Sequence, residues 1–180
     1  MLKFIIDFNL KNYNLKYSQK NQIEAWTKMK MKDIVFDSTI HKWKKDESEF
    51  DKLILNKENL LFLIQTDDNI KFGGFISSKI YKYNPYFIYD EKAFVFTFKD
   101  NKPMKFDIKK DKKYDAFYLC DKSHFGLFQI GYDIDIYKQN KKSHILQEER
   151  SSFDYQGIEN ALIGKTGYFW PKRIKVFQMK

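Results

Sequence analysis

The apolar residues of this chain fall into short, β-prone runs separated by turn residues, and this pattern limits the folds open to the chain. Residues 60–65 and 70–77 are two such runs, joined by the polar stretch 66–69. That stretch reads Thr-Asp-Asp-Asn, and Asp and Asn tolerate turn conformations, so the two runs predict a β-hairpin. Further strands are predicted over residues 33–38, 94–98, 102–108, 125–138 and 172–179.

Helical patterns are fewer than strand patterns. Residues 21–32 predict a short helix in which Asn21 is the N-cap and Glu24 completes a capping box. A second helix is predicted over residues 46–58, with three residues facing inward: Phe50, Leu53 and Ile54. The first ten residues alternate at period two and favour a strand, although a helix also fits their spacing. Together these elements predict an α+β, mostly β fold, a two-sheet β-sandwich with a few flanking helices.

Two adjacent glycines, Gly73 and Gly74, interrupt the apolar run 70–77 in a chain that has only seven glycines. Glycine weakens the interior of a strand, so the pair needs a physical reason. A phosphate-binding loop would need glycines that open a helix, whereas β-prone residues follow this pair and no Gly-Lys-Ser/Thr triplet adjoins it. The pair therefore predicts a close-packed neighbour that leaves no space for side chains.

The chain is basic, with a formal net charge of +9, and only Arg150 and Arg173 among its 33 basic residues are arginines. Residues 1–32 hold seven lysines against two acids. We therefore divide the chain into a basic leader, residues 1–32, and a sandwich domain, residues 33–180. Lysine is a point charge that attracts phosphate, whereas reading of guanine edges relies mainly on arginine, so the charge permits nonspecific binding to anionic polymers.

A second basic stretch, residues 98–113, holds seven lysines and three acids. Tyr114 and Phe117 follow it, and a basic groove beside aromatic rings is a feature of proteins that bind single-stranded nucleic acid. A solvated loop explains the same composition. The candidate contacts to an anion or nucleic acid are Lys105, Lys109, Lys110, Lys112 and Lys113.

Residues able to support catalysis are scarce, and the sequence predicts a protein without enzymatic activity, metal or cofactor. The three histidines do not form a His-x-x-x-His pair, and the single cysteine, Cys120, lies in an apolar stretch that predicts a core position. Asp133 and Asp135 open like a calcium loop, but position six is not glycine and position twelve is His144. We therefore expect the two aspartates on a solvated strand face.

The sequence predicts neither a transmembrane helix nor a signal peptide. No apolar run approaches the roughly 18 residues that a membrane-spanning helix needs. The first 14 residues contain an acid and several amides and lack a small-residue cleavage site. With one cysteine, a disulfide framework is excluded and a reducing compartment is expected.

Several blocks of the sequence, taken in order, resemble the TLDc domain family. They are IKFGGFISSKI (70–80), YDEKAFVFTF (89–98), HFGLFQIGYDIDIY (124–137) and ALIGKTGYFWPKRIKVFQM (161–179). The stretches IVFDSTIHKW (34–43) and FDKLILNKENLLFLIQT (50–66) are similar to the opening of that domain. The resemblance runs from about residue 33 to the C-terminus.

The resemblance implies a β-sandwich with flanking helices, in a family without an established active site. It places in a core hairpin Phe72, Gly73, Gly74 and Phe75; in a central strand Ala93, Phe94 and Phe96; and in a closing strand Ile174 and Val176. Phe125 and Gly126 belong to the same family motif. The family is associated with resistance to oxidative stress and with binding the vacuolar proton-pumping ATPase to regulate its assembly.

We therefore expect a noncatalytic interaction domain that acts in the oxidative-stress response through a protein partner, with subunits of the vacuolar ATPase as the family's example. The alternative is a basic, DNA-binding regulator of stress-linked transcription, supported by the leader and the lysines of residues 98–113. A third hypothesis is an enzyme that uses Cys120 as its nucleophile. The expected location is the cytoplasm, the nucleus or the cytosolic face of acidic organelles.

Overall fold

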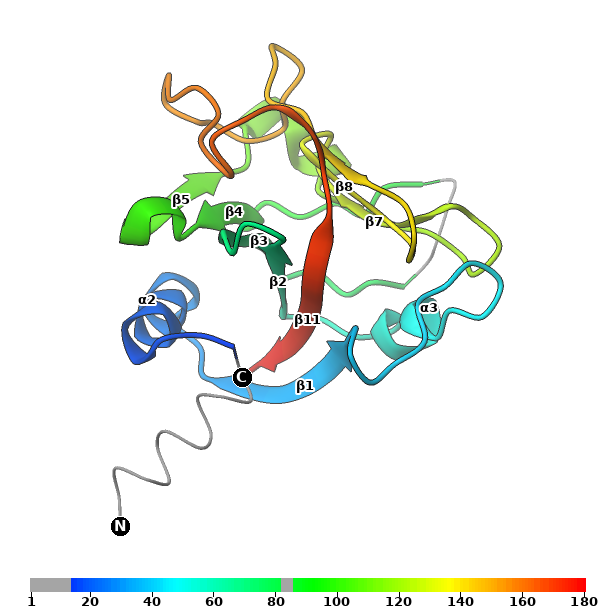
Figure 1. The fold of residues 1–180 in the computed structure, drawn as a ribbon. Coiled ribbons are helices and arrows are strands. Elements are labelled where there is room, and N and C mark those ends of the chain that lie inside the picture. The colour runs from blue at the N-terminus through cyan, green and yellow to red at the C-terminus, as the bar shows by residue number, and fades with distance from the viewer. Residues whose placement is uncertain (1–13, 82–85) are drawn as a thin grey trace.

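The chain folds into two antiparallel β-sheets packed face to face (Figure 1). The computed structural model describes residues 14–81 and 86–180. The helices are α2 (Tyr17–Thr27), α3 (Phe50–Ile54) and the short 3-10 helices η1 (Lys99–Asn101) and η2 (Lys110–Asp115). The strands are β1 (Met31–Asp37), β2 (Leu60–Thr66), β3 (Lys71–Ile76), β4 (Phe94–Thr97), β5 (Met104–Asp107), β6 (Phe117–Leu119), β7 (Gly126–Ile130), β8 (Ile134–Tyr137), β9 (Ser143–Ile145), β10 (Gly167–Phe169) and β11 (Pro171–Met179).

The first sheet has six strands in the order β1-β11-β2-β3-β4-β5, and the second has five in the order β10-β9-β8-β7-β6. The long last strand β11 inserts between β1 and β2, so the C-terminal segment lies inside the first sheet (Figure 1). This arrangement confirms the predicted mostly β sandwich. It also confirms the hairpin, because β2 and β3 pair directly across the turn at residues 66–69.

Phenylalanine rings from both sheets meet in the core between them. Phe62 of the first sheet lies 4.9 Å from Phe117 and 5.0 Å from Phe128 of the second, measured between ring centroids. Phe50 of α3 stacks on Phe128 at 5.2 Å and so closes one end of the core. Aromatic pairs at these separations add about 0.5–1.5 kcal/mol each beyond the area that they bury.

A second apolar cluster lies on the outer face of the first sheet, where α2 covers it. The Trp26 ring lies about 6 Å from three phenylalanine rings of β4 and its C-terminal end, namely Phe94, Phe96 and Phe98. The helix begins at Tyr17, after the N-cap Lys16, so the predicted start at Asn21 was wrong. Gln19 takes the capping position, because its side-chain oxygen accepts a hydrogen bond from the Lys16 N–H at 3.0 Å.

The basic leader is therefore, in its described part, a layer of the sandwich. Residues 17–27 cover the sheet, and the division drawn between residues 32 and 33 falls inside β1. Glu24, predicted to close a capping box, instead binds the Lys20 and Lys30 ammonium groups and the Met31 N–H. The strand predicted for the first ten residues lies outside the described part of the chain.

Gly73 and Gly74 confirm the predicted close packing. A Cβ atom on Gly73 would lie 1.8 Å from the backbone oxygen of Phe62 in the paired strand β2. On Gly74 it would lie 3.0 Å from the Ile130 side chain in the opposite sheet. The first contact cannot be relieved without moving the backbone, so glycine at position 73 sets how closely β2 and β3 approach.

Candidate interaction surface

Most residues of the family motif pack inside the molecule. Phe72, Gly74 and Ile76 face the second sheet, whereas Phe75, Phe94 and Phe96 face α2. Ala93 is buried and immediately precedes β4, which lies beside the edge strand β5. Ile174 and Val176 of β11 and Gly126 of β7 are buried as well. Phe125 differs, because its side chain is exposed at the start of β7.

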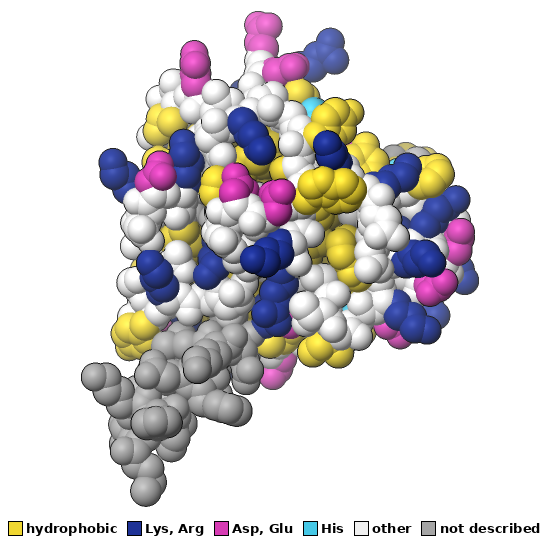
Figure 2. All heavy atoms as spheres, in the orientation of Figure 1, with side chains coloured by type: hydrophobic (Ala, Val, Ile, Leu, Met, Phe, Trp, Pro, Cys, Tyr) yellow, Lys and Arg dark blue, Asp and Glu magenta, His cyan; other side chains and the backbone are white. Residues whose placement is uncertain are grey.

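The five lysines proposed as anion contacts do not form one open basic surface. Lys105 in β5 pairs with Asp107 at 2.7 Å, and Lys113 in η2 pairs with Glu91 at 3.2 Å. Lys109 and Lys112 are half-buried, and Lys110 is exposed. On the face drawn in Figure 2, basic side chains are interspersed with acidic ones and form no single stripe. This placement weakens the case for phosphate binding at residues 105–113.

Cys120 is buried, as predicted, and its surroundings suppress thiolate formation. Burial raises the pKa of the thiol to about 12, and the nearby Asp135 carboxylate acts in the same direction. His124 lies close by, since a Cβ atom on Gly126 would touch both the Cys120 sulfur and the His124 ring. However, His124 Nδ1 accepts the Gly126 N–H at 2.9 Å. A reactive cysteine needs a lowered pKa and access, and Cys120 has neither.

The sequence contains one Gly-Lys-Thr triplet, residues 164–166, away from the Gly73–Gly74 pair. A phosphate loop requires the triplet to open a helix, but here it is exposed and leads into strand β10. Among the described residues there is also no group of three or more His, Cys, Asp or Glu side chains arranged to hold a metal ion.

Asp133 and Asp135 do not share a solvated strand face, so that prediction was wrong. Asp133 is completely buried, where its Oδ2 accepts the Ser152 N–H at 2.7 Å. Burial raises the pKa of Asp133 to about 6. Asp135 is half-buried on the opposite face of the sheet. Residues two apart in a strand would share a face, but Asp133 lies in the turn before β8, so its carboxylate points inward while Asp135 within the strand faces outward.

Asp135 belongs to a row of side chains that crosses all five strands of the second sheet. Cross-strand partners follow one another at a single register, from β10 to β6: Tyr168, His144, Asp135, Gln129 and Tyr118. Directly paired residues of antiparallel strands point to the same face. We call these five residues together with Tyr137 the outer face. All six are half-exposed or exposed, unlike the outer side of the first sheet, which α2 covers.

Polar contacts and ring contacts alternate along the outer face. The His144 and Tyr168 rings lie 4.9 Å apart. Burial raises the pKa of Asp135, while hydrogen bonds from Tyr137 and Gln129 partly offset this. Burial and the Asp135 charge also raise the pKa of the Tyr137 hydroxyl to about 12. The phenol therefore stays protonated and donates to the carboxylate.

The opposite end of the row is aromatic. Phe87 lies 5.1 Å from the Tyr118 ring and 5.1 Å from the Tyr132 ring. Tyr132 is 46% exposed, so the cluster continues to the molecular surface. A rigid surface of tyrosines around a few fixed polar groups is typical of protein-recognition sites.

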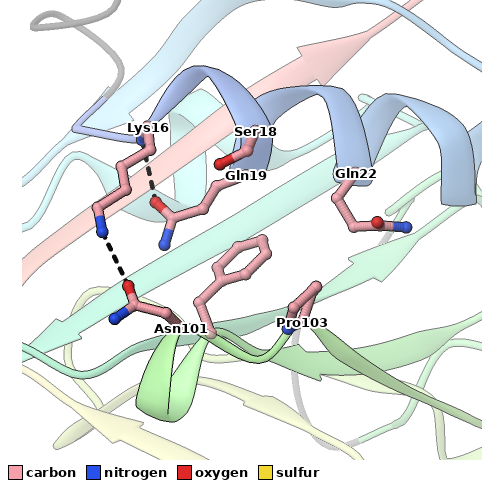
Figure 3. A pocket seen from close by; sticks show the side chains of 7 residues that line it. Lys16, Ser18, Gln19, Gln22, Asn101 and Pro103 are labelled. Atoms are coloured by element: carbon pink, nitrogen blue, oxygen red, sulfur yellow. Dashed lines mark hydrogen bonds between the residues drawn. The ribbon is translucent and has the colours of Figure 1, made fainter.

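A small hollow of about 250 Å³ lies elsewhere, between α2 and the β4–β5 connection (Figure 3). Lys16, Gln19 and Gln22 from α2 face Asn101 and Pro103 across it. The Lys16 ammonium donates to Asn101 Oδ1 at 2.8 Å, so polar groups on the two walls bond each other. This hydrogen bond links the start of α2 to the β4–β5 connection. The residues that line the hollow include no pair of groups suited to acid–base or nucleophilic chemistry.

The described residues thus combine a two-sheet sandwich, a helix-covered sheet and an open, aromatic outer face. The TLDc domain family matches residues 15–161 of the 180-residue chain. The chain belongs to the TLDc domain family. The match begins two residues before α2, which agrees with a helix that is part of the domain. No curated protein matches the chain. No helix in the described ranges is long and apolar enough to cross a membrane.

Sequence reasoning missed the outer face because its members come from five strands spread over residues 118–168. The single available signal was the pattern of polar and apolar residues in 125–138, which predicted one strand there. The structure has two strands, β7 and β8, joined by a turn in which Gly131 has φ +59°. That glycine allows the reversal that pairs Gln129 with Asp135.

Proposed function

We propose that this TLDc domain is a noncatalytic interaction module of the oxidative-stress response and that the outer face of its second sheet binds the partner protein. The observation that carries the proposal is the asymmetry between the two sheets. The first sheet hides its outer apolar residues beneath α2, whereas the second leaves Tyr168 66% exposed beside His144. Tyrosine supplies large contact area with little loss of side-chain freedom, which suits a binding surface.

Family membership suggests the biological setting, which is a role related to oxidative stress. Within that setting we propose subunits of the vacuolar proton-pumping ATPase as the partner. The absence of catalysis is part of the proposal, and the raised pKa of Cys120 supports it because the thiol is the one nucleophile singled out in the sequence. The DNA-binding alternative finds less support, since Lys105 and Lys113 are each paired with a carboxylate.

The test is an affinity capture from native lysate, treated with nuclease and read by mass spectrometry. Three baits are compared: the unchanged chain, Tyr168→Asp on the outer face, and Tyr17→Asp on α2. Tyr17 is a matched control because it is also an exposed tyrosine, 58% accessible, but belongs to the helix over the other sheet. We expect pump subunits with the unchanged chain and with Tyr17→Asp, and at least a tenfold loss with Tyr168→Asp.

Two results would contradict the proposal. Partners that disappear after nuclease treatment would point to nucleic acid as the bound species. Pump subunits captured equally by all three baits would remove the outer face as the binding site. Circular dichroism of each bait checks that both substitutions leave the sandwich folded.

A further inference from the structure

Two exposed aromatic rings at the edge of the second sheet are overlaid by lysines. The Lys141 Nζ lies 3.6 Å and the Lys45 Nζ 4.3 Å from the centroid of the Phe125 ring. The Lys142 Nζ lies 5.9 Å from the Trp170 ring. Phe125 is 49% and Trp170 45% exposed. We call these five residues the lysine–aromatic edge. On the face drawn in Figure 2, hydrophobic and basic side chains adjoin at several places on the upper right.

The lysine–aromatic edge continues the outer face. Ser143 of β9 pairs with Phe169 of β10, and both are buried in the sandwich. Lys142 and Trp170 lie just beyond the ends of these strands, are exposed, and are separated by one residue from His144 and Tyr168 respectively. The two surfaces consequently form one region of the second sheet.

A buried lysine holds the other half of this edge in place. Lys138 donates from its ammonium group to the carbonyl oxygens of Asp121, Lys122 and His124, at 2.6, 2.9 and 2.6 Å. Its own N–H donates to the Phe125 carbonyl at 3.0 Å. Lys138 itself is buried, so these bonds fix the loop that presents Phe125. The ring is thus presented by a rigid loop and needs little ordering on binding.

The charge of the edge is only partly compensated. Within the described ranges, Lys141 and Lys142 form no ion pair, and Lys45 has Asp46 at 3.9 Å. The turn at residues 66–69 borders the other side of Trp170, where Asp67 donates its N–H to the Trp170 carbonyl at 3.2 Å. That turn carries Asp67 and Asp68, so acidic residues border Trp170 on this side.

We propose that the lysine–aromatic edge binds an acidic segment of the protein partner, an inference that rests on the proposed function. Carboxylates would approach the Lys141 and Lys142 ammonium groups from the side and lie against the ring edges. Aromatic edges carry partial positive charge, so carboxylates are tolerated there. The segment extends from Trp170 toward Phe125, because the acidic turn repels it from the other side.

Single-stranded nucleic acid fits this edge less well. Base stacking needs an open aromatic face, whereas two ammonium groups lie over the Phe125 ring and one over Trp170. A base would have to displace a lysine and lose its cation–π interaction, worth about 0.5–1 kcal/mol at an exposed site. A carboxylate can accept hydrogen bonds from the same ammonium groups without displacing them from the rings.

The experiment measures fluorescence anisotropy of three labelled probes with the full chain at low salt. The probes are a peptide of eight glutamates and two phenylalanines, the same peptide with glutamine for glutamate, and a twelve-residue oligothymidylate. The test variant is Lys141→Glu/Lys142→Glu. The matched control is Lys79→Glu/Lys92→Glu, which makes the same charge change at two exposed lysines outside the edge and outside residues 98–113.

We expect the glutamate peptide to bind more tightly than the other two probes. The edge variant should weaken this binding about tenfold or more, equivalent to about 1.4 kcal/mol, and the control variant less than threefold. Tighter binding of oligothymidylate, or equal loss in both variants, would overturn the inference. A third outcome is that the unchanged chain does not bind the glutamate peptide but still captures pump subunits in a Tyr168-dependent way. That result would refute the binding of an acidic segment at this edge and leave the proposed function standing.

Discussion

Replacing Asp133 by asparagine should stabilise the protein at neutral pH, and the gain should disappear in acid. The carboxylate lies behind the β7–β8 turn, where Oδ2 accepts the Ser152 N–H and Oδ1 has no hydrogen-bond partner among the described residues. The Tyr155 hydroxyl is likewise buried without a partner there. Burial of the negative charge outweighs the stabilising interactions with Ser152, Tyr155 and Ser151, and so raises the pKa of Asp133 from 3.8 to about 6.

Proton linkage gives the sign and size of the contribution that Asp133 makes to the free energy of unfolding. Because the folded chain holds the proton more tightly than the unfolded chain, Asp133 contributes stability that is complete below the unfolded pKa of 3.8 and is lost as the pH rises through about 6. A shift of this size corresponds to about 3 kcal/mol in the free energy of unfolding. About 1.4 kcal/mol of it should be present at pH 5, and almost none at pH 7.5.

The assay is urea denaturation of the unchanged chain and of Asp133→Asn, followed by tryptophan fluorescence, at pH 7.5 and pH 5. Asparagine keeps the size of the side chain and an oxygen for the Ser152 N–H, but it does not ionise. The stability advantage of Asp133→Asn should therefore shrink by about 1.4 kcal/mol between the two pH values.

The difference in the free energy of unfolding between the two proteins cancels the pH dependence that the other carboxyl groups contribute to both. Asp135 also has a raised pKa, whereas hydrogen bonds from Arg173, Thr39 and Lys175 outweigh burial and lower the pKa of Asp37. A difference that stays constant between pH 7.5 and pH 5 would show that the Asp133 carboxyl does not change its protonation in this range. The burial argument would then be refuted.

Three further predictions concern stability and can be checked by the same denaturation assay. Gly73→Ala should lower the free energy of unfolding by on the order of 3 kcal/mol or more, because the added Cβ meets the backbone of β2. Gly74→Ala should lower it less, because the added Cβ mainly meets the flexible Ile130 side chain. Equal losses would contradict the argument that β2 approaches closely at Gly73. Lys138→Met should cost about 1–3 kcal/mol and increase hydrogen exchange at residues 121–125, since three carbonyls lose their donor, and unchanged exchange there would refute the positioning role. Asp37→Asn should cost about 3–5 kcal/mol at neutral pH by leaving the buried Lys175 ammonium without its anionic partner, and because the folded pKa of Asp37 is lowered, this cost should fall as the pH drops below its unfolded value of 3.8.

Local sequence patterns predicted much of the architecture because strands and turns depend on neighbouring residues. The β-prone run of β1, the Thr-Asp-Asp-Asn turn of the β2–β3 hairpin and the apolar run of β4 all correspond to observed elements. The start of α2 was misplaced because Asn21 is a good cap in isolation, whereas packing of Trp26 against β4 decides where the helix lies. Local capping preference is worth about 1 kcal/mol, and burial of an aromatic side chain is worth more.

The sequence by itself determined that this chain forms a mostly β sandwich, that Cys120 is buried and that Gly73 lies under a close neighbour. These properties follow from composition and from residues adjacent in the chain. Only the tertiary structure decided that Asp133 points inward and Asp135 outward, and that residues of five strands meet in one row. The physical reason for the row is register, because pairing between strands is set by the packing of the whole core, and a shift of one residue would move every side chain of a strand to the other face. Asp133 lies in the β7–β8 turn, so the alternation of β8 does not fix its direction.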